Sequence, residues 1–152
     1  MTYRHGSHTV FTIHLHLVWI TKYRKKVLVD SVALRVRDMI REICQAEEVD
    51  IIKGHVSKDH VHLFVSIPPQ VTISRLVQRL KGKTSFKLLN EFSHLRKTYW
   101  GRHFWARGYF CCSSGNVTDE MMSSNTLRTK MWPPMAISRL KVMTKNRRSR
   151  PR

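Results

Sequence analysis

The sequence has few acidic residues. Ten Asp and Glu stand against 28 Lys and Arg, so the 152-residue chain carries a formal charge of +18. An excess of this size indicates a polyanionic partner. The chain is not a disordered basic tail, because 41% of its residues are hydrophobic and several form runs of Val, Ile and Leu. We therefore expect one ordinary domain with a hydrophobic core.

Long apolar runs and paired cysteines are also scarce. The longest apolar stretch, residues 10–20, is interrupted by a threonine and two histidines and is shorter than the roughly 18 residues of a transmembrane helix. No secretory signal precedes it. Cys44, Cys111 and Cys112 lack Cys-x-x-Cys spacing, so neither a zinc knuckle nor a disulfide framework is indicated. We expect a cytoplasmic protein of a bacterium or archaeon without a membrane partner, in which Cys111 and Cys112 are buried small residues.

Acidic residues are absent altogether from residues 122–152. This segment has nine Lys and Arg and supplies half of the net charge. Residues 1–121 carry the other 19 basic residues and all 10 acidic ones, which leaves +9. Only residues 1–121 have the pattern of a folded domain, so we expect the tail to be poorly ordered.

The apolar pattern predicts six elements in the order β-α-β-β-α-β. They are a strand over 8–20, a helix capped by Asp30 or Ser31, strands over 49–56 and 60–67 joined by a turn at Lys58 and Asp59, a helix from Thr72, and, after a loop over 93–101, a strand over 103–112. This order predicts an α+β, ferredoxin-like (RRM-like) split βαβ fold, an antiparallel sheet with two helices on one face. A poorly patterned C-terminal helix is expected over 117–129.

A His-x-His pair, His60 and His62, lies in the third predicted strand. Residues i and i+2 of a strand point to the same face about 6.5–7 Å apart, so two imidazoles can grip one metal ion. A third ligand and open positions would still be needed to polarise a phosphodiester. Alone, the pair is more typical of surface or hydrogen-bonded histidines, and His14 and His16 have the same spacing. We interpret His16 as a structural strand histidine.

Two basic segments could contact DNA. The first is the loop after the first strand, with residues Lys22, Tyr23, Arg24 and Lys25, whose tyrosine could stack on an unpaired base. The second is a stripe that recurs every four residues along the second helix, formed by Arg75, Arg79, Lys83 and Lys87. A plain surface loop and a solvated helix face are the alternative interpretations.

Five aromatic residues follow the second helix. They are Trp100, Phe104, Trp105, Tyr109 and Phe110. We expect them to pack in the core and at a dimer face rather than to bind bases.

Several longer motifs occur in unbroken order over residues 8–121. They are HLVWITKYRK at 16–25, DHVHLFVSIPP at 59–69, LVQRLKGKTS at 76–85, YWGRHFWARGYF at 99–110 and GNVTDE at 115–120. Together they closely resemble the small HUH tyrosine transposases of bacterial insertion sequences. This chain of motifs is far more specific than the histidine pair alone.

The resemblance implies a homodimeric enzyme that binds single-stranded DNA hairpins at the ends of an insertion sequence. Such enzymes cut and rejoin strands through a 5′-phosphotyrosine with Mg²⁺ or Mn²⁺. By the resemblance, His60 and His62 are two metal ligands. A phenol is a poor nucleophile at neutral pH, which is why the scissile phosphate must be polarised by a metal ion.

The sequence departs from the family pattern near Met122. The family carries Tyr-Ile-x-x-Gln there, with Tyr as nucleophile and Gln as third metal ligand, whereas this chain has Asn125 and Thr129 at those positions. Neither replacement can do the lost chemistry. Back-translation of residues 122–142 with permitted codons, read from the third base of codon 122, recovers Tyr-Ile-x-x-Gln. We hypothesise that the tail is translated out of frame, which the nucleotide sequence around codon 122 would decide.

The leading interpretation is therefore a transposase with its catalytic and DNA-binding domain over 1–121 and an aberrant tail over 122–152. Such a chain is expected to be deficient in DNA cleavage. An alternative is a non-catalytic regulator that binds single-stranded nucleic acid on the same fold. A weaker one is a metal-dependent nuclease without a covalent intermediate. Tolerance of alanine at His60 and His62 would favour the regulator.

Overall fold

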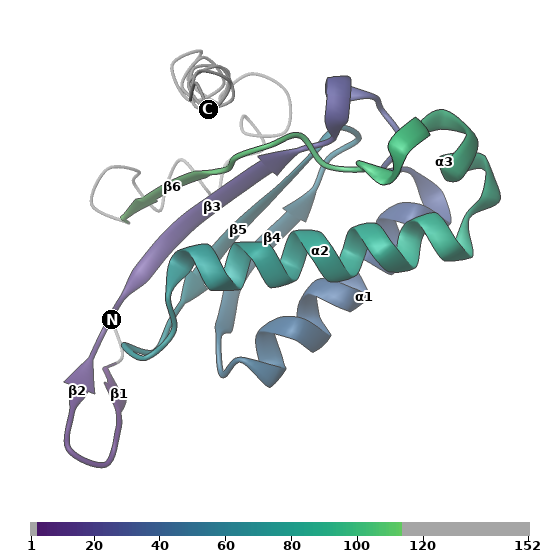
Figure 1. Ribbon diagram of the computed structural model, residues 1–152. Helices are drawn as coiled ribbons and strands as arrows, with labels where there is room; N and C mark the ends of the chain where they lie inside the picture. The colour runs from purple at the N-terminus through teal and green to yellow at the C-terminus, as the bar shows by residue number, and fades with distance from the viewer. Residues whose placement is uncertain (1–2, 114–152) are drawn as a thin grey trace, which may run out of the picture.

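The structure, a computed structural model, describes residues 3–113. Its elements are β1 (Arg4–His5), β2 (Val10–Phe11), β3 (His14–Ile20), the short 3₁₀ turn η1 (Lys22–Arg24), α1 (Asp30–Ala46), β4 (Asp50–Val56), β5 (His60–Ser66), α2 (Ile73–Glu91), α3 (Ser93–Thr98), η2 (Trp100–Arg102) and β6 (Phe110–Ser113). Figure 1 shows this arrangement. The expected helix over 117–129, the tail over 122–152 and the positions of Asn125 and Thr129 lie outside the described residues.

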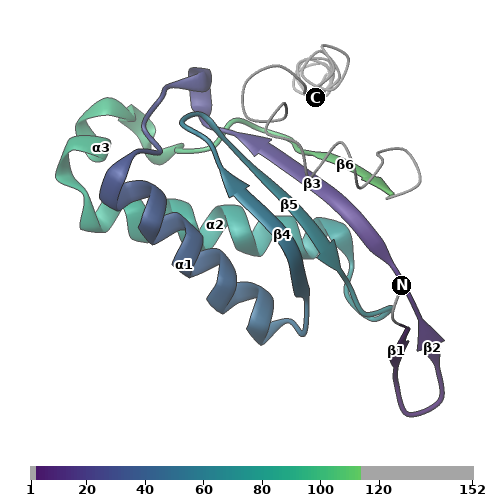
Figure 2. The ribbon, with the colours of Figure 1, turned by 180° about the vertical axis from the view of Figure 1, so that it is seen from behind.

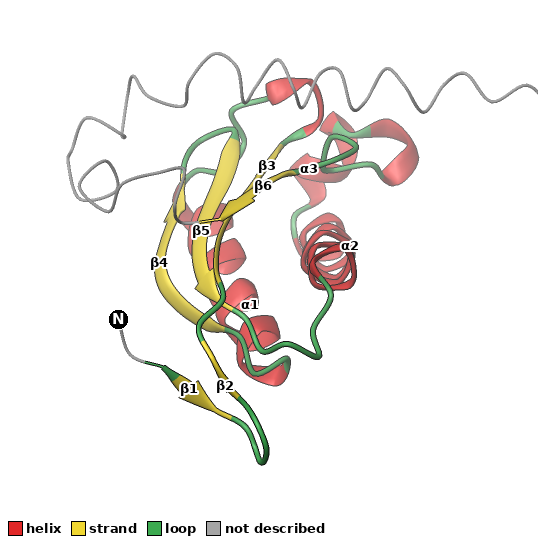
Figure 3. Ribbon diagram, turned by 90° about the vertical axis from the view of Figure 1, so that its left-hand side faces the viewer, coloured by secondary structure: helices red, strands yellow, loops and turns green. Residues whose placement is uncertain are grey.

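Four strands form one antiparallel sheet in the order β4-β5-β3-β6, and α1 and α2 cover the same face of it (Figures 1 and 3). The predicted ferredoxin-like fold is confirmed. Within residues 3–113 no helix is long and apolar enough to cross a membrane.

The core lies between the sheet and the two long helices. Alternate residues of the central strands point into it, namely Leu15, Leu17, Trp19, Val61, Leu63 and Val65. The helical apolar faces follow the predicted spacing and are buried against them: Val32, Val36, Met39, Ile40 and Ile43 on α1, and Leu76, Val77 and Leu80 on α2. The period of two along the strands therefore puts the residues in between, including the His-x-His pair, on the opposite face.

The first predicted strand is wrong in its length. Val10–Phe11 pairs with Arg4–His5 in a separate hairpin (seen from behind in Figure 2), and the sheet strand begins only at His14. The hairpin is tied to the sheet by the Arg4 guanidinium, which donates to the Ser66 carbonyl at 3.1 Å. The prediction of an Asp30 or Ser31 cap was also wrong, because α1 begins at Asp30, Val29 is at the N-cap, and no side chain caps it.

The predicted strand over 103–112 is much shorter in the structure. Phe104 and Trp105 enter the core instead, where they are 0% and 6% exposed. Gly108 then turns the chain with a φ of 82°, so regular pairing with β3 starts at Phe110. The loop expected over 93–101 contains α3 and η2.

Candidate metal and nucleic-acid site

His60 and His62 lie on the sheet face opposite the helices. Val61 between them is fully buried in the core, and the period of two turns both imidazoles the other way. The register places His62 between Val18 on β3 and His55 on β4. The pair therefore lies on β5, between its neighbouring strands β3 and β4.

His16, interpreted from the sequence as a structural strand histidine, is fully buried and lies beside His62. Its Nδ1 lies 3.3 Å from Nε2 of His62, and its ring stacks on Phe64 with centroids 4.5 Å apart. Because a neutral imidazole has one donor and one acceptor nitrogen, this contact requires complementary tautomers. The period of two places His16 on one face of its strand, but only the register between β3 and β5 brings it to His62, and His55 of β4 lies opposite His62 on the other side.

Asp59 connects the pair to the basic loop. Its Oδ1 accepts a hydrogen bond from His60 Nδ1 at 2.8 Å, and its Oδ2 accepts one from Arg24 at 3.1 Å. Burial raises the pKa of Asp59, but the hydrogen bond and charge of His60, together with Arg24, outweigh burial and hold the pKa below its usual value. The ionised carboxylate fixes the His60 ring and leaves its Nε2 as the ring nitrogen for another ligand.

Burial, together with the charges of the neighbouring His16, His60 and His55, lowers the pKa of His62 to about 4. The imidazole is therefore neutral at physiological pH. Neutral imidazole is the form that binds metal ions.

The donor set around His60 and His62 fits part of a metal site. Within residues 3–113 no group of three His, Cys, Asp or Glu side chains is arranged to hold a metal ion. Two imidazoles with a carboxylate behind one of them suit two positions of a transition-metal ion, whereas Mg²⁺ prefers oxygen ligands. Of the two ions expected from the sequence, Mn²⁺ matches these donors better.

The basic loop lies at the same end of the sheet as His60. Tyr23 is 76% exposed, and Lys22 and Lys25 place their ammonium groups over its ring at 5.1 and 6.0 Å from the centroid. Lys25 Nζ also donates to the Thr98 carbonyl at 3.2 Å. The four predicted loop residues are thus brought together, with Arg24 held by Asp59.

The stripe on α2 borders α1 rather than standing alone on a solvated face. Arg79 forms an ion pair with Glu47, and Lys83 and Lys87 line a small hollow beside Met39 and Glu42 of α1. Arg75 is exposed at the start of the helix. Part of the stripe's positive charge is therefore neutralised within the fold.

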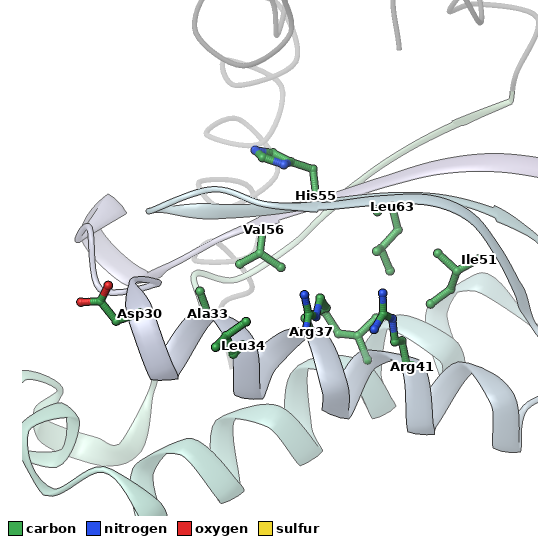
Figure 4. A pocket seen from close by; sticks show the side chains of 11 residues that line it. Asp30, Ala33, Leu34, Arg37, Arg41, Ile51, His55, Val56 and Leu63 are labelled. Atoms are coloured by element: carbon green, nitrogen blue, oxygen red, sulfur yellow. The ribbon is translucent and has the colours of Figure 1, made fainter. Parts of the chain in front are cut away.

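A larger cavity of about 530 Å³ lies between α1 and β4. Its floor is apolar, with Ile51 and Leu63 contributing, and Arg37 and Arg41 of α1 reach toward the sheet across it (Figure 4). His55 points to the other side of β4 in the same view. The cavity and the histidine face therefore lie on opposite sides of the sheet.

Three further residues differ from the expectations. Trp100 is 90% exposed and so does not pack in the core of the chain, which leaves the expected dimer face as a prediction, whereas Phe104 and Trp105 lie in the core as expected. Cys111 and Cys112 are half-buried rather than buried, and burial raises the pKa of both thiols, with Cys112 adding to the effect on Cys111. Raised thiol pKa values disfavour the reactive thiolate, in accord with unreactive residues.

Lys81 was not singled out from the sequence. Its Nζ donates to the carbonyls of Ala106 and Gly108 at 2.6 and 2.9 Å, and burial lowers its pKa to about 8. The spacing indicates its burial, because Lys81 follows the buried Val77 by four residues and so lies on the same face of the helix. The side chain fastens the segment before β6 to α2.

These features define a class: a ferredoxin-like α+β domain with a His-x-His pair on the sheet face away from its helices. Comparison with known proteins identifies the family. Residues 9–124 match the family described as "Transposase IS200 like", and the chain belongs to that family of DNA strand transferases. The resemblance noted from the motifs is confirmed.

Individual relatives agree with this assignment. The chain is 32% identical to the transposase for insertion sequence element IS200 of Salmonella typhimurium over 115 residues, 76% of each chain. It is 35% identical to the ISDra2 transposase TnpA of Deinococcus radiodurans over 104 residues, 68% of this chain and 74% of the relative.

Solved structures agree as well. A crystal structure of a Deinococcus radiodurans R1 protein assigned as a transposase has a TM-score of 0.68 at 28% identity, covering 94% of this chain and 96% of that one. The REP-associated tyrosine transposase bound to a REP hairpin shares the fold, with a TM-score of 0.53 at 11% identity, covering 74% of this chain and 62% of that chain.

Proposed function

We propose that this transposase-family chain binds single-stranded DNA hairpins at the ends of an insertion sequence but does not cleave them. The observation that carries the proposal is the combination of family membership with Asn125 at the position where the family pattern has its tyrosine. An amide cannot form the phosphotyrosine, and Thr129 at the third-ligand position is a weak, unactivated alcohol. DNA binding does not depend on either group.

The charge and the loop geometry support DNA binding. Residues 1–121 carry +9, and each phosphate contact adds counterion release to the affinity. Two basic side chains of the loop, Arg24 and Lys25, are fixed by their contacts with Asp59 and Thr98, and exposed Arg75 lies at the start of α2. The REP-associated relative in the comparison is bound to a hairpin, which supports the same class of partner here.

His60 and His62 would hold Mn²⁺ or Mg²⁺ in an active relative of this chain. When bound, such an ion polarises the scissile phosphate. Asp59 orients the His60 imidazole, and the burial of His62 keeps its ring neutral. In this chain these residues are retained without the nucleophile, so we propose that they are dispensable for hairpin binding. We also propose a homodimer, which light scattering of the purified protein tests.

A non-catalytic regulator on the same fold is the second candidate. The loss of the Tyr-Ile-x-x-Gln pattern favours it, since a chain without that pattern retains only recognition. Both candidates bind nucleic acid without cleaving it, and they differ in whether the chain is a recently inactivated transposase or an established regulator. A frame change near codon 122 would favour a recently inactivated transposase.

The test uses the inverted-repeat hairpins encoded on either side of this gene, with their single-stranded flanks, as labelled probes. We expect a gel shift and, with Mn²⁺ or Mg²⁺, no covalent adduct that survives denaturation. The variant H60A/H62A should bind within about twofold of the parent chain. A chain re-read in the frame that carries Tyr-Ile-x-x-Gln should form the adduct, and its own H60A/H62A variant should lose it.

Two results would contradict the proposal. A covalent adduct with the present chain would show that it cleaves DNA. Absence of any shift with hairpins, under conditions in which the re-read chain binds them, would show that hairpin recognition needs the missing segment.

A further inference from the structure

We propose that Tyr23 and Trp100 form an aromatic rim that stacks on unpaired bases in the DNA strand beside the hairpin. This inference rests on the proposed function and adds to it a surface for the single-stranded flank. Trp100 is 90% exposed and Tyr23 76%, whereas Trp19 and Trp105 are buried in the core. Tyr and Trp are enriched at binding surfaces, because their rings offer a large apolar face together with a polar group.

Local backbone geometry holds both rings outward. Tyr23 and Arg24 have φ values of 60° and 52°, a left-handed conformation that is uncommon for residues other than glycine. The Thr21 hydroxyl stabilises this turn by donating to the Lys25 carbonyl at 2.8 Å. Gly101, directly after the exposed tryptophan, has a φ of 80°. A left-handed backbone at residues other than glycine, as at Tyr23 and Arg24, is strained, persists where the surroundings enforce it and is common at ligand sites.

The two segments that carry the rings lie side by side (Figures 1 and 2). The Lys22 amide donates to the Phe104 carbonyl at 2.9 Å, and the Lys25 ammonium donates to the Thr98 carbonyl. That ammonium also lies 5.4 Å from the Tyr99 ring centroid, next to Trp100 in sequence. One lysine thus links the two segments.

The charge around the rim matches a nucleic-acid strand. Residues 20–26 and 93–103 contain seven Lys and Arg and no acidic residue. The carboxylate that contacts the loop, Asp59, accepts hydrogen bonds from both His60 and Arg24. Aromatic rings within a basic surface bind single strands, because stacking needs the face of an unpaired base. Duplex DNA keeps those faces stacked inside the helix, so the rim fits the flank and not the hairpin stem.

Asp59 also fixes where the rim lies relative to the histidine pair. Its two carboxylate oxygens join His60 to Arg24, the residue after Tyr23. A strand that stacks on the rim would therefore run next to His60. The rim would hold the single-stranded flank at the end of the sheet where the family's histidines lie.

The experiment compares two labelled probes in fluorescence anisotropy: a hairpin with its single-stranded flank and the same hairpin with blunt ends. Single variants W100A and Y23A are measured with F86A as the matched control, since Phe86 is 68% exposed on α2. W100A and Y23A should each weaken binding of the flanked probe about tenfold and leave the blunt probe unchanged. F86A should change neither.

The outcomes separate this inference from the proposed function. If the parent chain binds the flanked hairpin and W100A binds it equally well, the rim is wrong while hairpin binding stands. If W100A instead changes the oligomeric state by light scattering at unchanged DNA affinity, Trp100 is a contact between copies and the rim is likewise wrong. If the parent chain binds neither probe, both proposals fail.

Discussion

Replacement of Lys81 by methionine should destabilise the fold by removing one ammonium group while keeping most of the aliphatic stem. The ammonium donates to the Ala106 and Gly108 carbonyls at 2.6 and 2.9 Å. A hydrogen bond from a charged donor contributes about 1.5–3 kcal/mol. The desolvation that lowers the Lys81 pKa from 10.5 to about 8 opposes this with about 3 kcal/mol. The two bonds together contribute about 3–6 kcal/mol, so the substitution should lower the unfolding free energy by about 1.5 kcal/mol, with about 3 kcal/mol as the upper value.

Denaturant unfolding followed by tryptophan fluorescence measures this cost, since Trp105 lies next to the fastened segment. For a domain of this size, the expected loss corresponds to a Tm lower by about 5–10 °C. K83M is the matched control, because Lys83 is exposed on the same helix, and it should change the free energy by less than about 0.5 kcal/mol. Equal unfolding free energies for K81M and K83M would refute the reasoning.

Two further predictions concern the same region. T84V should lower the unfolding free energy by about 1–3 kcal/mol, because the buried Trp105 indole donates to the Thr84 hydroxyl at 2.9 Å and would be left without an acceptor. T98V removes a hydroxyl that bonds a helix carbonyl at an exposed site and should lower the unfolding free energy much less. Equal losses for the two variants would contradict the role of Thr84. Between about pH 8 and 10.5, the unfolding free energy of the parent chain should rise relative to that of K81M. The reason is that burial lowers the Lys81 pKa from 10.5 to about 8 in the folded chain, so the unfolded chain binds more protons in this range. Parallel pH profiles for the two proteins would contradict a buried ammonium.

The arrangement of the fold could be predicted because it depends on periodicity. The alternation along β3 and β5 and the helical spacing in α1 and α2 identify the core, and the order of elements leaves few topologies. The same alternation placed His60 and His62 on one face. Strand ends were less predictable: Phe104 and Trp105 have the composition of a strand, yet they fill the core beside Lys81 instead of extending the β6 ladder.

The parts of the site that were missed depend on contacts between distant segments. Nothing in the spacing of His16 shows that it meets His62, because that contact requires the register between β3 and β5. The exposure of Trp100 depends on the turn at Gly101 and not on residue type, since Trp19 and Trp105 have the same side chain and are buried. Composition identifies aromatic residues but does not say which of them pack inward.

In the proposed function, the residues that bind DNA lie apart from the position of the nucleophile. Such a chain would therefore keep DNA binding without cleavage. The surfaces proposed to bind DNA, the basic loop and the exposed aromatic residues, lie in η1 and η2 and the segments beside them, and Asp59 joins the loop to His60. These contacts lie within residues 3–113, whereas the family pattern places its nucleophile at Asn125. Under the proposed function, a change confined to the residues after Met122 would remove covalent chemistry while leaving the +9 charge of residues 1–121 unaltered. Because counterion release and stacking need only this part of the chain, we expect recognition to outlast catalysis.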